Sequence, residues 1–190
     1  MLRWFLHRQI TAFERDWNYD AGYIHELIDV DPRAMLALGK LQAISGYRKG
    51  VPPAAYHAAR IVAAMAEDCG PCTQLGIDMA QRGAVDPVVL RAVITRDFEA
   101  MPAEVALAVR FTEAILQHAP EADELREEVV RHFGKQGLIA LSFAMLGAHM
   151  YPTFKYALGH GRACTRLAIG DEKVPVLREL TQSMPRTSAA

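Results

Sequence analysis

Hydrophobic positions recur every three or four residues along most of the chain, which is the period of a helix with one buried face. The first such stripe runs through Leu2, Leu6, Ile10, Phe13 and Trp17. No sustained alternation of apolar and polar residues follows, and no Asn-Gly or Asp-Gly hairpin signal is present. The pattern therefore predicts an all-α protein.

Local signals divide the chain into helices. Asp31-Pro32 and Asp86-Pro87 each place a capping carboxylate before a proline, which the first helical turn tolerates. A helix is also expected from Pro53, before a second helix that restarts after a Gly-Pro pair. These signals agree with the helical period.

The C-terminal half shows the same pattern with two interruptions. Gly134 is expected to end one helix, and Gly137–Met150 is expected to form a buried one. Pro152 is expected to break that helix, which then resumes to Leu158. A last short helix is expected over Pro175–Leu180.

Size and charge limit the alternatives. The 190 residues predict a single helical domain over 1–180 and a loose tail over 181–190. With 21 Lys+Arg, 22 Asp+Glu and a net charge of −1, the chain lacks the basic run that nucleic acid or an anionic membrane attracts. The longest apolar stretch, Leu138–Ala148, is about half of the roughly 20 residues of a membrane span. We therefore expect neither partner, and a cytoplasmic location.

Candidate chemistry centres on Cys69 and Cys72, which a Gly-Pro pair separates. The Gly-Pro pair provides a sharp turn and places Cys72 in the first turn of a helix, where the helix dipole favours a thiolate. The adjacent carboxylates of Glu67 and Asp68 should raise the thiol pKa or accept its proton. A third cysteine, Cys164, leaves an odd count that fits a structural disulfide framework poorly.

Three alternatives accompany the redox interpretation. The tetrapeptide is that of thioredoxin, but a helix rather than a strand precedes it, so the thioredoxin fold is not expected. The two cysteines could be inert side chains packed in a turn. A zinc site would need two further ligands, such as His160 and Cys164, and we expect no metal.

The segment HAARIVAAMAEDCGPC, which ends at Cys72, resembles the alkylhydroperoxidase D-like and carboxymuconolactone decarboxylase superfamily. The resemblance covers about residues 52–164. It implies an alkylhydroperoxidase D-like helical bundle that assembles as a trimer or hexamer. For the branch with a cysteine pair it implies an antioxidant thiol peroxidase with no cofactor, reduced by a dithiol or lipoyl partner.

The resemblance also implies roles for single residues. Cys72 matches the cysteine that attacks peroxide, and Cys69 matches the resolving cysteine. The family's glutamate twelve residues before the first cysteine is His57 here, and its histidine after the second cysteine is Gly76. If the helical hairpin turns near residues 66–67, His57 lies level with Gly76 and is a candidate base; the alternative is a packed histidine.

The sequence thus favours an oxidoreductase that acts on a peroxide or disulfide substrate. The alternative is a non-catalytic member of the same fold with inert or regulatory thiols. His149 is a further candidate neighbour of the site, whereas Lys155 is expected on an interface or solvated face. Apolar stripes on nearly every helix, together with Trp4, Phe5 and Tyr151, give more apolar surface than one small bundle hides, which adds to the expectation of a homo-oligomer.

Overall fold

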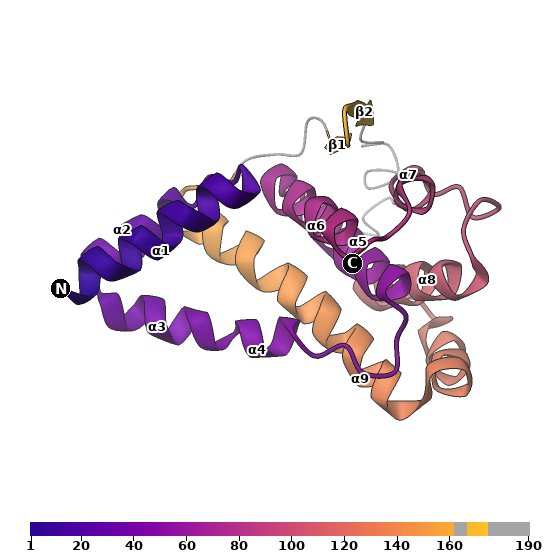
Figure 1. The fold of residues 1–190 in the computed structure, drawn as a ribbon. Coiled ribbons are helices and arrows are strands. Elements are labelled where there is room, and N and C mark those ends of the chain that lie inside the picture. The colour runs from indigo at the N-terminus through magenta and orange to yellow at the C-terminus, as the bar shows by residue number, and fades with distance from the viewer. Residues whose placement is uncertain (162–166, 175–190) are drawn as a thin grey trace, which may run out of the picture.

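Helices dominate the structure, a computed structural model that describes residues 1–161 and 167–174, so the predicted all-α class is confirmed (Figure 1). The expected helix over Pro175–Leu180 and the tail over 181–190 lie outside the described residues. The helices are α1 (Leu2–Trp17), α2 (Gly22–Val30), α3 (Pro32–Lys40), α4 (Gln42–Ser45), α5 (Pro53–Ala66), α6 (Gly70–Arg82), α7 (Pro87–Thr95), α8 (Ala103–Gln117) and α9 (Ala122–Ala157).

Two predicted helix starts are confirmed in atomic detail. The Asp31 carboxylate accepts a hydrogen bond from the backbone N–H of Arg33 at 2.8 Å, at the start of α3. The Asp86 carboxylate accepts from the N–H of Val88 at 2.8 Å, at the start of α7. Each bond satisfies one of the N–H groups that a helix leaves without a partner in its first turn.

Helix α9 follows the predicted pattern at Gly134 and departs from it at Pro152. Gly134 adopts φ 70° and ψ 176°, which breaks the helix there. Pro152 does not end the helix, which continues to Ala157. Its ring is buried, and α9 packs against α4, α5 and α8, so tertiary contacts offset the backbone bond that proline removes.

Because α9 passes through Pro152, it contains an apolar window long enough to cross a membrane by length and composition. The sequence predicts no such segment, because its longest apolar stretch was placed at Leu138–Ala148. Within the protein, 44% of that window is buried.

A small antiparallel hairpin, β1 (Leu167–Ile169) and β2 (Glu172–Val174), was not expected from the sequence. Its turn is formed by a Gly-Asp pair, in which Gly170 adopts φ 58°. The sequence was searched only for Asn-Gly and Asp-Gly turns, so this hairpin was missed. The Gln74 amide holds the hairpin on α6: it donates to the Ala168 carbonyl at 2.9 Å and accepts from its N–H at 2.8 Å.

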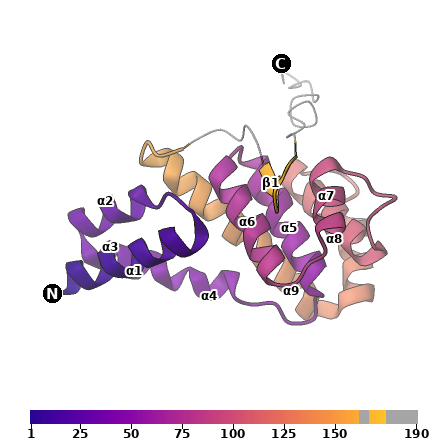
Figure 2. The ribbon, with the colours of Figure 1, turned by 45° about the horizontal axis from the view of Figure 1, so that its top comes forward.

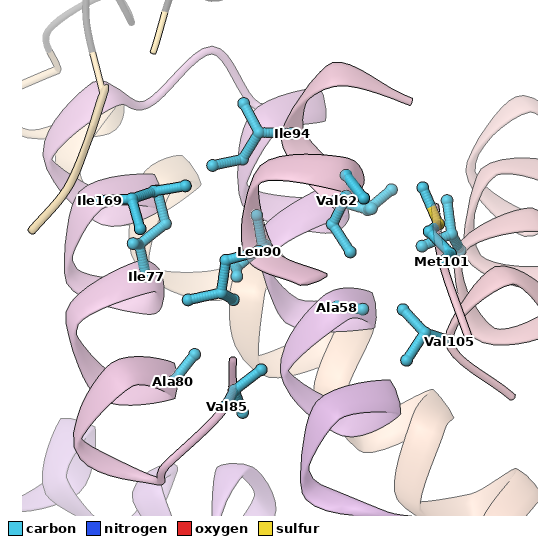
Figure 3. Packing of buried hydrophobic residues seen from close by; sticks show 14 of the residues in the cluster. Ala58, Val62, Ile77, Ala80, Val85, Leu90, Ile94, Met101, Val105 and Ile169 are labelled. Atoms are coloured by element: carbon cyan, nitrogen blue, oxygen red, sulfur yellow. The ribbon is translucent and has the colours of Figure 1, made fainter. Parts of the chain in front are cut away.

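Helix α5 lies at the centre of the bundle and contacts α6, α7, α8 and α9. One face contributes Ala58 and Val62 to a core shared with α6, α7, α8 and the hairpin (Figure 3). Leu90 of α7 is only 1% exposed there. This core fixes α5 and α6 against each other.

Helices α1–α4 stand to one side of this bundle (Figure 1 and Figure 2). They bury a core of their own around Leu6, Tyr23 and Ile28. Leu75 of α6 and Phe154 of α9 pack against that core. The space between α1–α4 and the bundle is where the candidate site lies.

Candidate functional site

Cys69 and Cys72 form a disulfide at the start of α6, with their Cα atoms 5.3 Å apart. Cys69 is the residue that caps α6, and Cys72 lies in the first helical turn. Thr73 secures the turn, because its N–H and its hydroxyl both donate to the Cys69 carbonyl, at 2.9 and 3.0 Å. The predicted position of the pair at a helix N-terminus is confirmed.

The two sulfurs differ in accessibility. Cys69 is fully buried, whereas Cys72 is partly exposed and lines a cavity of about 520 Å³. A small molecule that enters the cavity therefore meets Cys72 first.

The cavity separates the N-terminal helices from the bundle. Its walls come from α1–α4 on one side and from α5, α6 and α9 on the other. Most of the lining is apolar and includes Ile10, Phe13 and Leu38. Among the described lining residues, the charged side chains are Arg48 and Arg60.

Tyr19 is the polar group closest to Cys72 in the described hydrogen-bond network. Its hydroxyl lies 3.9 Å from Cys72 Sγ and accepts a hydrogen bond from Lys155 Nζ at 3.2 Å. The Lys155 ammonium also lies 4.7 Å from the ring centre of Tyr19 and 5.1 Å from that of Tyr23. A buried cation and a hydroxyl thus form a chain that ends at the accessible sulfur.

Burial keeps Tyr19 protonated. Removal of its ring from water raises the pKa of Tyr19 to about 12, because the phenolate would lose its hydration. Burial also raises the pKa of Tyr23. At neutral pH the Tyr19 hydroxyl is therefore a hydrogen-bond donor available to a thiolate on Cys72.

The sequence predicts that His57 lies level with Gly76, and the structure shows that it does not. A side-chain Cβ placed at Gly76 would instead meet Ile61 at 3.5 Å, and one placed at Gly83 would meet His57 Nε2 at 3.4 Å. The hairpin turns between residues 68 and 69 rather than near 66–67, because residues 67–69 all belong to the connection. Ile61, which lies four residues or about one helical turn after His57 on α5, therefore occupies the level that was expected for His57.

The environment of His57 is that of a packed side chain. It is 1% exposed, and its Nδ1 has no hydrogen-bond partner among the described residues. Burial, together with the positive charges of Arg60 and Arg48, lowers the pKa of His57 to about 4. His57 does not line the cavity with Cys72.

Glu67 and His149 lie next to each other and form an ion pair, and neither lines the cavity with Cys72. Glu67 Oε1 lies 2.5 Å from His149 Nδ1, and its other oxygen accepts from the Thr153 hydroxyl at 3.4 Å. The Asp68 carbonyl accepts from the Tyr156 hydroxyl at 3.1 Å, and Asp68 adopts φ 49° in the connection. These contacts fasten the α5–α6 connection to α9.

The ligands considered for zinc are only partly described. His160 Nε2 lies 2.7 Å from Glu26 Oε2, and Cys164 lies outside the described residues. Within residues 1–161 and 167–174, no group of three or more His, Cys, Asp or Glu side chains is arranged to hold a metal ion.

Sequence reasoning missed three residues of the site: Tyr19, Lys155 and Arg60. Lys155 was expected on an interface or solvated face, but it is 3% exposed. Its burial depends on the two tyrosine rings of the α1–α2 region, which lie more than 130 positions away in the chain. Apart from the position of Lys155 in the helical repeat, the neighbouring sequence does not indicate this contact.

No protein-family model, no curated protein and no solved structure matches the chain.

Proposed function

We propose that the protein is a thiol-dependent peroxidase or disulfide oxidoreductase, in which Cys69 and Cys72 cycle between a dithiol and a disulfide. The observation that carries the proposal is the asymmetry of the pair: Cys72 faces the cavity and Tyr19, while Cys69 is buried behind it. The resemblance of the cysteine segment to the alkylhydroperoxidase D-like superfamily supports the same chemistry.

In the first step, the Cys72 thiolate attacks the terminal oxygen of a hydroperoxide. An S–O bond forms, the O–O bond breaks, and the alkoxide leaves as an alcohol after it takes a proton. Tyr19 is placed to relay that proton, and Lys155 next to it stabilises the negative charge on the tyrosine oxygen during transfer. The product on Cys72 is a sulfenic acid.

In the second step, Cys69 attacks the sulfur of this sulfenic acid. The S–S bond forms and hydroxide leaves as water with the proton of the Cys69 thiol. The Cα–Cα distance of 5.3 Å already suits the disulfide. An external dithiol, such as a lipoyl-type partner, returns the two electrons through thiol–disulfide exchange at the accessible Cys72.

Three features favour the thiolate of Cys72. Cys72 lies in the first turn of α6, where the helix dipole stabilises an anion. The Tyr19 hydroxyl can donate to the sulfur, and the Lys155 ammonium lies directly behind that hydroxyl. These positive influences replace the acid–base pair that the family resemblance leads one to expect at positions 57 and 76.

The test counts thiols in a Cys164→Ser background, which leaves only the pair. Reduced protein treated with one equivalent of an organic hydroperoxide should lose two thiols per chain, and a dithiol should restore both. The Cys69→Ser variant should stop at a sulfenic acid on Cys72, which a dimedone-type reagent traps. The matched Cys72→Ser variant should form no trapped product.

Retention of both thiols after hours with peroxide, together with no exchange with a disulfide substrate, would contradict the proposal. That result would favour the alternative of inert cysteines in a helical protein.

The assembly expected from the sequence stays a prediction. Trp4 and Phe5 of α1 are 65% and 51% exposed, which leaves apolar surface on the outside of this helix. We therefore propose a homo-oligomer, for which light scattering at micromolar concentration is the measurement. A monomeric mass there would refute it.

A further inference from the structure

Arg60 lies on α5 and lines the same cavity as Cys72. Its Nε is buried and has no hydrogen-bond partner, and its Nη1 meets only the thioether sulfur of Met79, at 3.6 Å. Among the described residues, no carboxylate forms an ion pair with Arg60. The cavity wall thus holds a guanidinium that has no negatively charged partner among the described residues.

Such an arrangement is costly without an anion. A buried charge is normally paired, since its loss of hydration must be compensated by hydrogen bonds to an opposite charge. Burial is the largest influence on the pKa of Arg60 and lowers it, because the charged guanidinium loses hydration. Arg48 is exposed and lines the cavity as well, which makes the local potential positive.

The rest of the cavity is suited to hydrocarbon. Ile10, Phe13, Ile24 and Leu38 of the N-terminal helices face it, and its lining contains no aspartate or glutamate among the described residues. A volume of about 520 Å³ lies within the range of sites that bind small organic ligands, roughly 300–1,000 Å³.

We propose that this cavity binds an amphipathic carboxylate, whose head group pairs with Arg60 and whose hydrocarbon body lies against α1–α3. A guanidinium presents parallel donors that match the two oxygens of a carboxylate. Arg60 is the half-buried guanidinium of the lining and Arg48 is exposed, so a head group seated at Arg60 pairs with one guanidinium.

This binding site also deepens the proposed function, on which the following step rests. Because Arg60 and Cys72 line one cavity, a carboxylate held by Arg60 places its chain beside the accessible sulfur. The substrate of the redox pair would then be an organic hydroperoxide or disulfide that carries a carboxylate, in preference to hydrogen peroxide.

Calorimetric titration of the oxidised wild-type protein with decanoate tests the binding site. Saturable binding is expected, with at least tenfold weaker binding of the uncharged decanol. Arg60→Gln should weaken decanoate binding by about 10- to 100-fold, as expected for the loss of a hydrogen-bonded charge pair. Arg110→Gln is the matched control, because Arg110 of α8 packs over the Phe98 ring and does not line the cavity.

Equal binding of decanoate and decanol to the wild-type protein would overturn the proposal, and this comparison holds even if Arg60→Gln fails to fold. Tighter binding of decyl phosphate than of decanoate would also overturn it, because the head group would then be a phosphate. The titration contains neither peroxide nor reductant, so inert cysteines would leave its result unchanged. Conversely, thiols that cycle with hydrogen peroxide in a protein that ignores decanoate would refute only the binding site.

Discussion

The Tyr19 hydroxyl lies 3.9 Å from Cys72 Sγ, although 53 positions separate the two residues in the chain. Tyr19 belongs to the connection between α1 and α2, and Cys72 to the first turn of α6. Packing of Leu75 and Phe154 against the N-terminal core brings the two together. The N-terminal helices therefore supply a polar partner that the cysteine segment itself does not contain.

Replacement of Tyr19 by phenylalanine should raise the pKa of the reduced Cys72 thiol by about one unit. A hydrogen bond to a charged group contributes about 1.5–3 kcal/mol, and one pKa unit corresponds to about 1.4 kcal/mol. The rate of alkylation of Cys72 by iodoacetamide as a function of pH measures this pKa. Tyr47→Phe is the control, since Tyr47 packs against Phe143 elsewhere. Equal pH profiles for the two variants would remove Tyr19 from the mechanism.

Lys155 should act on the thiol through Tyr19. Lys155→Met retains much of the buried volume and removes the ammonium that donates to the Tyr19 hydroxyl. We expect it to slow oxidation of Cys72 by an organic hydroperoxide about three- to tenfold, and to have a smaller effect once Tyr19 is phenylalanine. Stopped-flow rates for the two single variants and the double variant form a double-mutant cycle. Strictly additive effects would mean that Lys155 acts on the sulfur independently of Tyr19.

Local capping could be predicted from the sequence, whereas the environment of the thiol pair could not. The Asp-Pro signals at residues 31 and 86 depend only on neighbours within one helical turn, and both are confirmed. The position of His57 relative to Gly76 depends on the length of the connection, and an error of about two residues in the turn centre displaced it by about one helical turn. Burial of Lys155 depends on aromatic rings from another part of the chain, which periodicity does not reveal.

Glu67 should contribute to stability rather than to thiol chemistry. Glu67→Gln removes the ion pair with His149 Nδ1. The Glu67 side chain is 25% exposed and the His149 side chain is 33% exposed. A partly exposed ion pair contributes about 0–1 kcal/mol, so we expect a loss of at most about 1 kcal/mol in urea unfolding. The alkylation rate of Cys72 should change less than threefold. A tenfold or larger change would restore Glu67 as a group that tunes the thiol pKa.

Burial of His57 should make the protein lose stability in mild acid. Because the pKa of His57 is about 4 in the folded protein and about 6.5 in an unfolded chain, the unfolded state binds more protons between these values. The free energy of unfolding should therefore fall as the pH is lowered from 6.5 to 4, by an amount on the order of 3 kcal/mol. Urea unfolding across this pH range measures the slope.

The control for this effect is another histidine. His57→Gln should flatten the pH dependence in that window, whereas His132→Gln should leave it intact, because His132 is exposed. A His57→Gln variant with the wild-type slope would show that other groups cause the acid sensitivity.

Substitution of Gly76 by histidine should bring an imidazole next to the attacking sulfur. Gly76 lies four residues after Cys72 on α6, a spacing that places two side chains on one helix face, and it lines the cavity. A Cβ there makes an ordinary contact of 3.5 Å with Ile61, so the helix can accept the change. An imidazolium beside a thiolate lowers the pKa of the thiol, by at least about one unit at this range. Gly76→His should therefore accelerate alkylation of Cys72 at pH 6–7 by about tenfold. The control, Gly76→Ala, should leave that rate unchanged. Equal rates in the two variants would show that position 76 does not face the sulfur.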